Sequence, residues 1–516
     1  MNDFIVYAML MGALSSGDAT PFWAQANQNG LVPQNCIALA QVQAYKPLEL
    51  GLSGPNSVGT AAFARPAKAF QWQAGASFAG ALDNRPGGLK ALPMLDQLYA
   101  GIRWKVLGLD AGMMHRSREF LGSDAALGSL SVTEGHVVES NNARSMPGYS
   151  LVLEPWAVPF TKGHVHISGL WGDYKPLGHR FMDGALVHRL RGYLRYDIAA
   201  GFFVQLGLDH YALWAGSNPE YGTIPVTLGN YFRIATARKG TSENSGGDQL
   251  NRLGDHGGAE QFRFGWQGEG RRVTFQWEKP YADKSGMRMD NFPDGVYTLH
   301  FSLSDKNHWI SDMLLEAHYT MWQSGTIFEK ELDDNGNPLP PEERAGLKNT
   351  GCDNYFNNVE YRSGWTNMGR PICGPLFFAG PDERGYWNIR NNRYKALHLG
   401  VGGKFFRVAP YRLMLTAGEY FGTYHYPYVG ESSMMSGWNW WERNTIDRGL
   451  FQFSAGLNGT VPLRLWGGTA GDSTVALSGR TTHRAPCIAV CYGIFADFGK
   501  VLPHNLGATL GATLSF

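Results

Sequence analysis

The residues of this sequence best suited to ligand chemistry are amides and aromatic rings in one long polar segment, 349–395. Sugars present rings of hydroxyl groups beside apolar C–H patches, so planar amides, guanidinium groups and stacked aromatic faces hold them. The candidates of these types are Asn354, Tyr355, Asn357, Asn358, Trp365, Asn391, Asn392 and Arg393. They predict a carbohydrate-binding surface. The alternative is that the segment folds inward as a plug that stiffens the interior of a barrel.

Two further aromatic groups allow the same two interpretations. The segment 423–447 contains S-G-W-N-W-W-E-R-N, which brings Trp438, Trp440 and Trp441 close together. Near the N-terminus, A-T-P-F-W-A-Q-A-N contains Trp23 and Asn27. These two side chains either contact a saccharide or pin the first loop inside the fold, and the second interpretation is favoured.

Signals for catalysis are weak. His164 and His166 in H-V-H share one strand face and would be a possible metal pair, but no third ligand has a suitable spacing. The sequence contains neither a G-x-S-x-G nor an H-E-x-x-H motif. We therefore expect no enzyme, no metal and no cofactor. A hydrolase with Ser and His on adjacent strands stays an alternative, because linear motifs would not reveal it.

The five cysteines are an odd number, so at least one has no partner within the chain. Cys487 and Cys491 lie in a strand-like segment about 13 Å apart, too far for a disulfide. Cys352 and Cys373 flank a long polar loop and either close it in an oxidising compartment or remain thiols.

Composition limits the class of protein. The 516 residues include 45 Lys+Arg and 44 Asp+Glu, a net charge of +1, which argues against a nucleic-acid partner. No run approaches 18 apolar residues, which excludes a helical membrane span. Strands of a transmembrane barrel need only about 10 residues of alternating polarity each, so that architecture is allowed.

Alternation of apolar and polar residues is the dominant pattern. In the last segment, Leu506, Ala508, Leu510, Ala512, Leu514 and Phe516 share one face, while Gly and small polar residues share the other. This period of two predicts a strand with one apolar face. Arg189, Arg191 and Arg195 lie on the polar face of another such segment. About 20 segments of this kind predict an all-β fold: one domain, 1–516, forming a closed antiparallel transmembrane β-barrel of about 18 (16–20) strands. Residues 3–12 are interpreted as its first strand, with an atypical signal peptide as the alternative.

The connections between these segments divide into short and long sets. Counting backwards from the last strand gives a periplasmic set of 481–486, 459–461, 407–410, 305–308, 268–271, 198–201, 156–162, 106 and 47–68. The long connections 13–36, 116–148, 215–257, 323–395 and 423–447 fall on the opposite, extracellular side. Such segregation is typical of an outer-membrane barrel, and we separately expect its lumen to be plugged. The segment 47–68 is the exception.

Several segments, in the same order along the chain, resemble the capsule assembly Wzi family. They are S-S-G-D-A-T-P-F-W-A-Q-A-N-Q-N-G-L at 15–31, L-S-V-T-E-G-H-V-V-E-S-N-N-A-R-S-M-P-G-Y at 130–149, G-L-D-H-Y-A-L-W-A-G at 207–216, and D-N-Y-F-N-N with the following I-R-N-N-R. The resemblance implies an eighteen-stranded outer-membrane barrel without catalysis. It further implies a lectin that attaches capsular polysaccharide to the cell surface, so that polysaccharide is an expected partner. Outer-membrane lipid is the other, because the apolar outer faces of the strands are expected to meet it.

A porin or sugar-uptake channel is the main rival, because its barrel would show the same alternation. In a channel, Arg189, Arg191 and Arg195 would form a charged filter and give stable ion steps in planar bilayers. A plugged lectin would give few or none. Replacing Trp438, Trp440 and Trp441 with Ala should weaken polysaccharide retention if these rings hold the glycan.

Overall fold

The computed structural model describes most of the chain. The described residues are 5–17, 19–48, 50–52, 64–66, 69–115, 125–241, 252–330, 333–340, 343–430, 448–463 and 487–515.

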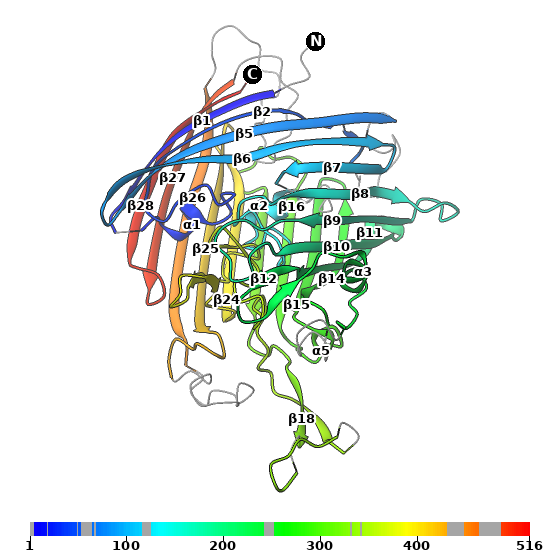
Figure 1. The fold of residues 1–516 in the computed structure, drawn as a ribbon. Coiled ribbons are helices and arrows are strands. Elements are labelled where there is room, and N and C mark those ends of the chain that lie inside the picture. Colours follow the sequence, from blue (N-terminus) through cyan, green and yellow to red (C-terminus); the bar gives the residue numbers. More distant parts are fainter. Residues whose placement is uncertain are drawn as a thin grey trace.

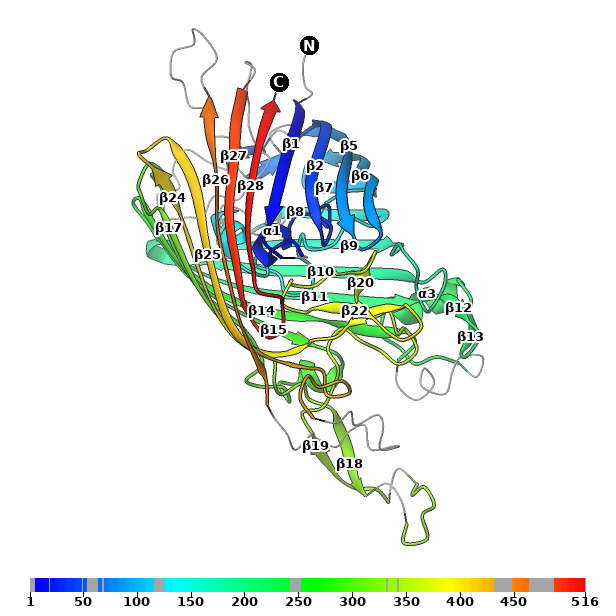
Figure 2. The same ribbon diagram turned by 90° about the vertical axis from the view of Figure 1, so that its left-hand side faces the viewer.

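The chain folds into a closed antiparallel barrel of 18 strands (Figures 1 and 2). The strands are β1 (Ile5–Ser15), β2 (Cys36–Lys46), β5 (Phe70–Arg85), β6 (Gly88–Trp104), β7 (Leu107–Met113), β8 (Pro147–Ala157), β9 (Val165–Tyr174), β10 (Leu186–Asp197), β11 (Phe202–Trp214), β14 (Asp255–Gly268), β15 (Arg271–Tyr281), β16 (Gly295–Leu303), β17 (Asp312–Tyr319), β24 (Arg393–Phe405), β25 (Ala409–Gly422), β26 (Leu450–Leu463), β27 (Cys487–Gly499) and β28 (Asn505–Ser515). Each pairs with its neighbours, and β1 closes the ring by pairing with β28 from Tyr7↔Ser515 to Ser15↔Gly507. The predicted fold class is confirmed.

Short elements decorate the connections. The helices are α1 (Phe22–Gln25), α2 (Ala125–Leu130), the 3₁₀ turn η2 (Ala199–Gly201), α3 (Leu228–Ala235) and α5 (Lys284–Met287). Paired short strands are β3 (Leu50–Leu52) with β4 (Ala64–Pro66), β12 (Gly216–Asn218) with β13 (Gly222–Ile224), β18 (Thr326–Lys330) with β19 (Ala345–Asn349), β20 (Thr366–Asn367) with β21 (Arg370–Pro371), and β22 (Ala379–Pro381) with β23 (Trp387–Ile389). Within the described part of the chain, no helix is both long and apolar enough to cross a membrane.

The polarity of the barrel is that of a membrane protein. On β28, Leu506 and Leu510 are 56% and 66% exposed on the outer face. On β10, Arg189, Arg191 and Arg195 are buried toward the lumen. Apolar side chains therefore face outward, where lipid can cover them, and charged side chains face a filled interior.

Two details of the predicted strands are wrong. The residues 459–461, predicted as a turn, lie inside β26, which continues to Leu463 because its ladder with β27 is unbroken from Gln452 to Leu463. The predicted strand 474–480 and turn 481–486 lie outside the described residues. In addition, β5 and β6 are longer than expected and meet at a turn over 86–87.

The connections segregate by barrel end. We call the end that carries 16–35, 114–146, 215–254, 320–392 and 423–449 the loop end, and the end that carries both termini the terminal end. Connections at the terminal end include 105–106, 158–164, 269–270 and 406–408. The predicted division into long and short connections is confirmed with two exceptions at the terminal end: 47–69, which carries β3 and β4, and the long connection 464–486 between β26 and β27, which lies outside the described residues.

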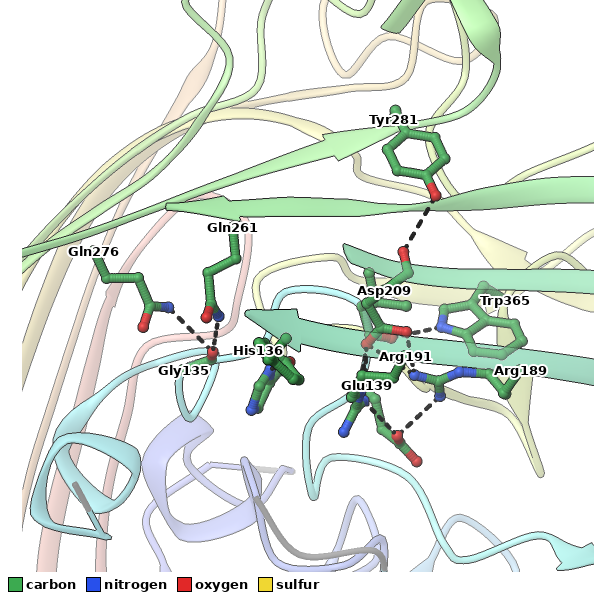
Figure 3. Close-up of polar contacts among 12 residues, drawn as sticks. Gly135, His136, Glu139, Arg189, Arg191, Asp209, Gln261, Gln276, Tyr281 and Trp365 are labelled. Carbon is green, nitrogen blue, oxygen red and sulfur yellow. Dashed lines mark hydrogen bonds and ion pairs between the residues drawn. The ribbon is translucent and has the colours of Figure 1, made fainter. Parts of the chain in front are cut away.

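Two stretches from the loop end fold back and fill the barrel. We call residues 125–146 and 353–378 the lumen plug. Their side chains join one buried apolar cluster with inward-facing wall residues, including Val137, Phe377 and Tyr211. Polar contacts fix the plug to the wall, because Gly135 O accepts bonds from Gln261 Nε2 at 3.4 Å and Gln276 Nε2 at 3.1 Å (Figure 3).

Candidate functional site: an arginine-lined cavity at the loop end

The arginine charges on the lumen wall are neutralised by carboxylates of the wall and of the lumen plug. The Arg189 and Arg191 guanidinium groups both donate to the Asp209 carboxylate at 2.8 Å, and Glu139 of the plug accepts from them at 2.8 and 3.1 Å (Figure 3). Arg195 pairs with Asp197 at 2.7 Å. Buried ion pairs are stable only when each charge is compensated, and here the carboxylates meet that need. These arginines therefore hold the plug in place.

The predicted ring platform in the long loop is internal. Trp365 has no exposed surface, stacks on Tyr211 with ring centroids 3.9 Å apart, and donates from Nε1 to Val138 O at 2.6 Å. The Tyr355 hydroxyl donates to Asp294 Oδ2 at 3.0 Å and is also buried. Both side chains pack the plug, as the plug interpretation expected.

The predicted amides bind the loop to itself. Asn354 Oδ1 accepts from Asn357 Nδ2 at 3.0 Å and from Asn392 Nδ2 at 2.6 Å. Asn391 Nδ2 donates to Leu376 O at 3.0 Å, and Asn358 Oδ1 accepts the backbone N–H of Glu360 at 2.8 Å. Arg393 is buried over the Tyr424 ring at 3.8 Å. The amides therefore bond mainly within the connection between β17 and β24, whereas Arg393 contacts a ring of the next connection.

The N-terminal candidates also face inward. Trp23 of α1 is 5% exposed, and its ring lies 5.3 Å from that of His398 on β24. Asn27 Nδ2 donates to Val132 O in the plug at 2.9 Å. These contacts match the favoured interpretation that the segment is pinned inside the barrel. Trp438, Trp440 and Trp441 lie outside the described residues, so their predicted role stays a prediction.

Other sequence candidates hold structural positions. His164 Nδ1 lies 2.6 Å from Asp197 O, and His166 Nδ1 lies 3.2 Å from the Asp197 carboxylate. Cys352 and Cys373 are both buried and are not joined by a disulfide, so of the two alternatives the thiols are present.

The described loops enclose a cavity of about 1060 Å³ at the loop end. The first loop, the β5–β6 turn, the plug, the connection after β9, the β20–β23 region and the connection after β27 all contribute to its wall. Among the described residues, its charged lining consists of Arg85, Arg144, Arg180, Arg370, Arg390 and one carboxylate, Asp497. The imbalance of five cations to one anion gives the cavity a positive potential.

Backbone carbonyls, rather than carboxylates, hold most of these guanidinium groups. Arg180 donates to Thr366 O at 2.5 Å and Gly364 O at 2.9 Å, Arg390 donates to Pro381 O at 2.9 Å, and Arg370 donates to Val32 O. Within the described part of the chain, Arg85 is the one of these five arginines that forms an ion pair with a carboxylate, that of Asp83. Burial lowers the pKa of Arg180 to about 10, against an opposing effect of the Asp255 carboxylate, and lowers that of Arg370 to about 10, so both side chains keep their positive charge at neutral pH.

Aromatic rings complete the lining. Phe22, Phe378, Trp387 and Tyr428 contribute to the cavity wall, and Gly369 leaves room for the Trp387 ring, which a Cβ atom there would approach to 3.1 Å. Guanidinium forks bind carboxylate or phosphate in a bidentate manner, and ring faces bind the C–H faces of sugars. The combination suits a chain of acidic sugars. The sequence did not reveal this site, because its arginines are scattered singly over several connections, and the two that share one, Arg370 and Arg390, are far apart within it.

Comparison with known proteins identifies the class of protein. No model of a protein family matches the sequence, and no curated protein matches it. Among solved structures, Wzi of Escherichia coli, an outer-membrane protein described as a carbohydrate-binding β-barrel involved in group 1 capsule assembly, is 12% identical over all of this chain and 84% of its own, with a TM-score of 0.51. OccK3 (OpdO) of Pseudomonas aeruginosa is 10% identical over 100% and 96%, with a TM-score of 0.42, and OprD of Pseudomonas aeruginosa is 7% identical over 99% and 94%, with a TM-score of 0.43. The chain therefore has the fold of an outer-membrane β-barrel.

Proposed function

We propose that this barrel binds an acidic surface polysaccharide in its loop-end cavity and helps to attach or assemble a capsule. In this proposal the loop end faces the cell exterior, and binding involves no catalytic step. The observation that carries it is the lining of the cavity, five arginines and one carboxylate around about 1060 Å³ of space beside four aromatic rings. The Wzi likeness in fold is consistent with it.

A conducting channel is less well supported by the interior. The plug crosses the lumen, and the wall arginines that a charged filter would need are paired with Asp209, Glu139 and Asp197. A positive cavity above a filled lumen favours retention of an anion at the surface over its passage.

The test compares acidic and neutral glycans. Purified protein in detergent should bind polygalacturonate and should not bind neutral dextran, as measured by isothermal titration calorimetry. The double variant Arg370→Gln/Arg390→Gln should bind polygalacturonate about tenfold or more weakly, because each charge-assisted bond is worth about 1.5–3 kcal/mol.

The matched control is Arg384→Gln. Arg384 lies in the same loop and is 60% exposed, but it pairs with Glu220 at 2.6 Å and does not line the cavity. The Arg384→Gln variant should bind polygalacturonate with unchanged affinity. The proposal would be contradicted if the protein bound dextran and polygalacturonate equally well. It would also be contradicted if the control and the double variant lost affinity for polygalacturonate to the same extent.

A further inference from the structure

A short helix lies outside the barrel wall, and none of its residues lines the cavity. Helix α3 belongs to the connection between β11 and β14 and sits beside the loop-end termini of β10 and β11 (Figures 1 and 2). Its start is fixed by Thr227, whose hydroxyl accepts the Asn230 N–H at 3.1 Å. The helix therefore has a defined N-terminus.

One face of α3 is packed against the barrel. Ile234 is fully buried in the apolar cluster, and the Tyr231 ring lies 5.9 Å from that of Trp214 on β11. The Tyr231 hydroxyl donates to Asp173 Oδ2 at 3.0 Å and accepts from Trp171 Nε1 at 2.9 Å. These contacts fix the rotation of the helix about its own axis.

The opposite face presents large apolar side chains that the described protein leaves uncovered. Leu228 and Phe232 of the helix are 78% and 64% exposed, and Val226, which lies just before the N-cap Thr227, is 66% exposed. Leu228 and Phe232 are one helical turn apart, so they form a single ridge. Exposing such side chains to water is unfavourable, by about 25 cal/mol for each Å².

This ridge continues the lipid-facing surface of the wall. Tyr149 on β8 donates to the same Asp173 oxygen as Tyr231, at 2.5 Å. Leu151, two residues along the same outward face, is 52% exposed, and Leu206 on β11 is 51% exposed. Two residues along a strand span only about 7 Å, so α3 docks where the apolar belt of the barrel ends.

Basic residues follow the ridge. Arg233 lies in the last turn of α3, and Arg238 and Lys239, both exposed, follow within four residues of its end at Ala235. No carboxylate occurs between Tyr221 and Thr241. Apolar side chains beside Lys and Arg are the composition of helices that lie in a membrane interface and attract anionic headgroups.

We propose that α3 is an interfacial anchor: Val226, Leu228 and Phe232 insert into the lipid leaflet at the loop end, and Arg238 and Lys239 bind the phosphate groups of anionic lipids there. The helix ties the β11–β14 connection to the bilayer surface. It thereby fixes the depth of the loop end in the membrane, independently of any glycan.

The test measures insertion directly in the full-length protein. A chain with Cys487→Ser and Cys491→Ser carries Phe232→Cys, labelled with a nitrobenzoxadiazole fluorophore, in nanodiscs of phosphatidylcholine doped with spin-labelled lipid. Leu228→Cys provides a second labelling site. Val359→Cys is the control, because Val359 is 64% exposed in the connection between β17 and β24. Lipid quenching should be severalfold stronger at both helix sites than at the control. Quenching equal to the control, as expected if a second protein copy or water covers the ridge, would overturn insertion.

The headgroup contact is tested with lipid charge. In equimolar phosphatidylglycerol and phosphatidylcholine, quenching by spin-labelled phosphatidylglycerol should exceed that by spin-labelled phosphatidylcholine. The double variant Arg238→Ala/Lys239→Ala should remove that preference, whereas Lys90→Ala, an exposed basic residue on the β5–β6 hairpin, should keep it. A preference that survives the double variant would overturn the phosphate contact.

Discussion

Trp365 of the lumen plug and Tyr211 of the barrel wall lie face to face, with ring centroids 3.9 Å apart and an angle of 13° between their planes. Residues more than 150 positions apart in the sequence meet here. Arg189 lies over the same indole, 5.5 Å from its centroid, so the stack joins the apolar packing of the plug to the ion pairs of the wall.

Trp365→Ala should therefore destabilise the folded barrel. The substitution removes a fully buried indole and its bond to Val138 O, and the free energy of unfolding should fall by about 3–5 kcal/mol. Urea unfolding in detergent micelles, followed by tryptophan fluorescence, measures this. Phe160→Ala, at a fully exposed side chain, should change the value by less than about 0.5 kcal/mol. Comparable effects of the two substitutions would show that the plug does not stabilise the barrel.

Asp209→Asn should also lower the free energy of unfolding. The substitution leaves the buried Arg189 and Arg191 with Glu139 as their remaining carboxylate partner. Breaking a buried pair by neutralising one partner costs about 3–5 kcal/mol. Asp305→Asn, at a 60% exposed side chain, is the control for the same unfolding measurement. A neutral effect of Asp209→Asn would mean that water compensates these arginines.

The stability of the protein should depend on pH through Asp294. Burial raises the pKa of this carboxyl, which lies in the connection before β16, from 3.8 to about 7. The folded state therefore holds a proton that the unfolded state releases, and this group's contribution to stability is full below about pH 4 and is lost as the pH rises toward 7. Asp294→Asn should flatten the fall in urea midpoint between pH 5 and 7. An unchanged slope would contradict the assignment.

The filled lumen predicts little ion conduction. Purified protein inserted in planar bilayers should give few or no stable current steps, because plug residues such as Val132 and Trp365 are buried among the side chains of the wall. Regular, voltage-independent steps would instead support the channel hypothesis. As a control for folding, polygalacturonate binding is measured on the same protein preparation that is used for the bilayer recordings.

Much of the fold could be predicted from the sequence, because apolar and small or polar residues alternate along each strand according to which side faces lipid and which faces the interior. The alternation of Leu506 and Leu510 with Gly507 and Thr509 reports lipid on one side and the interior on the other, whatever the neighbouring strands are. Strand ends were harder to place. Nothing local at 459–461 distinguishes a turn from a continuing strand, and the ladder with β27 decides the matter.

The site could not be predicted in the same way. Asn354, Asn391 and Asn392 carry the functional groups of a sugar-binding surface, but the same groups satisfy the backbone of an irregular loop packed inside a barrel. Residue type does not separate these two roles. Arg180 and Arg370 meet at the cavity only because the connections that carry them fold over the same opening.

The seam between β1 and β28 has a consequence for biogenesis. Each of these strands lacks one neighbour until the other arrives, so the first strand to be made waits for the last before its open backbone edge is satisfied. Hydrocarbon offers no substitute for that missing partner. The ring must therefore be assembled where water or a helper protein shelters the unpaired edge, and its entry into the bilayer is coupled to the joining of the two ends.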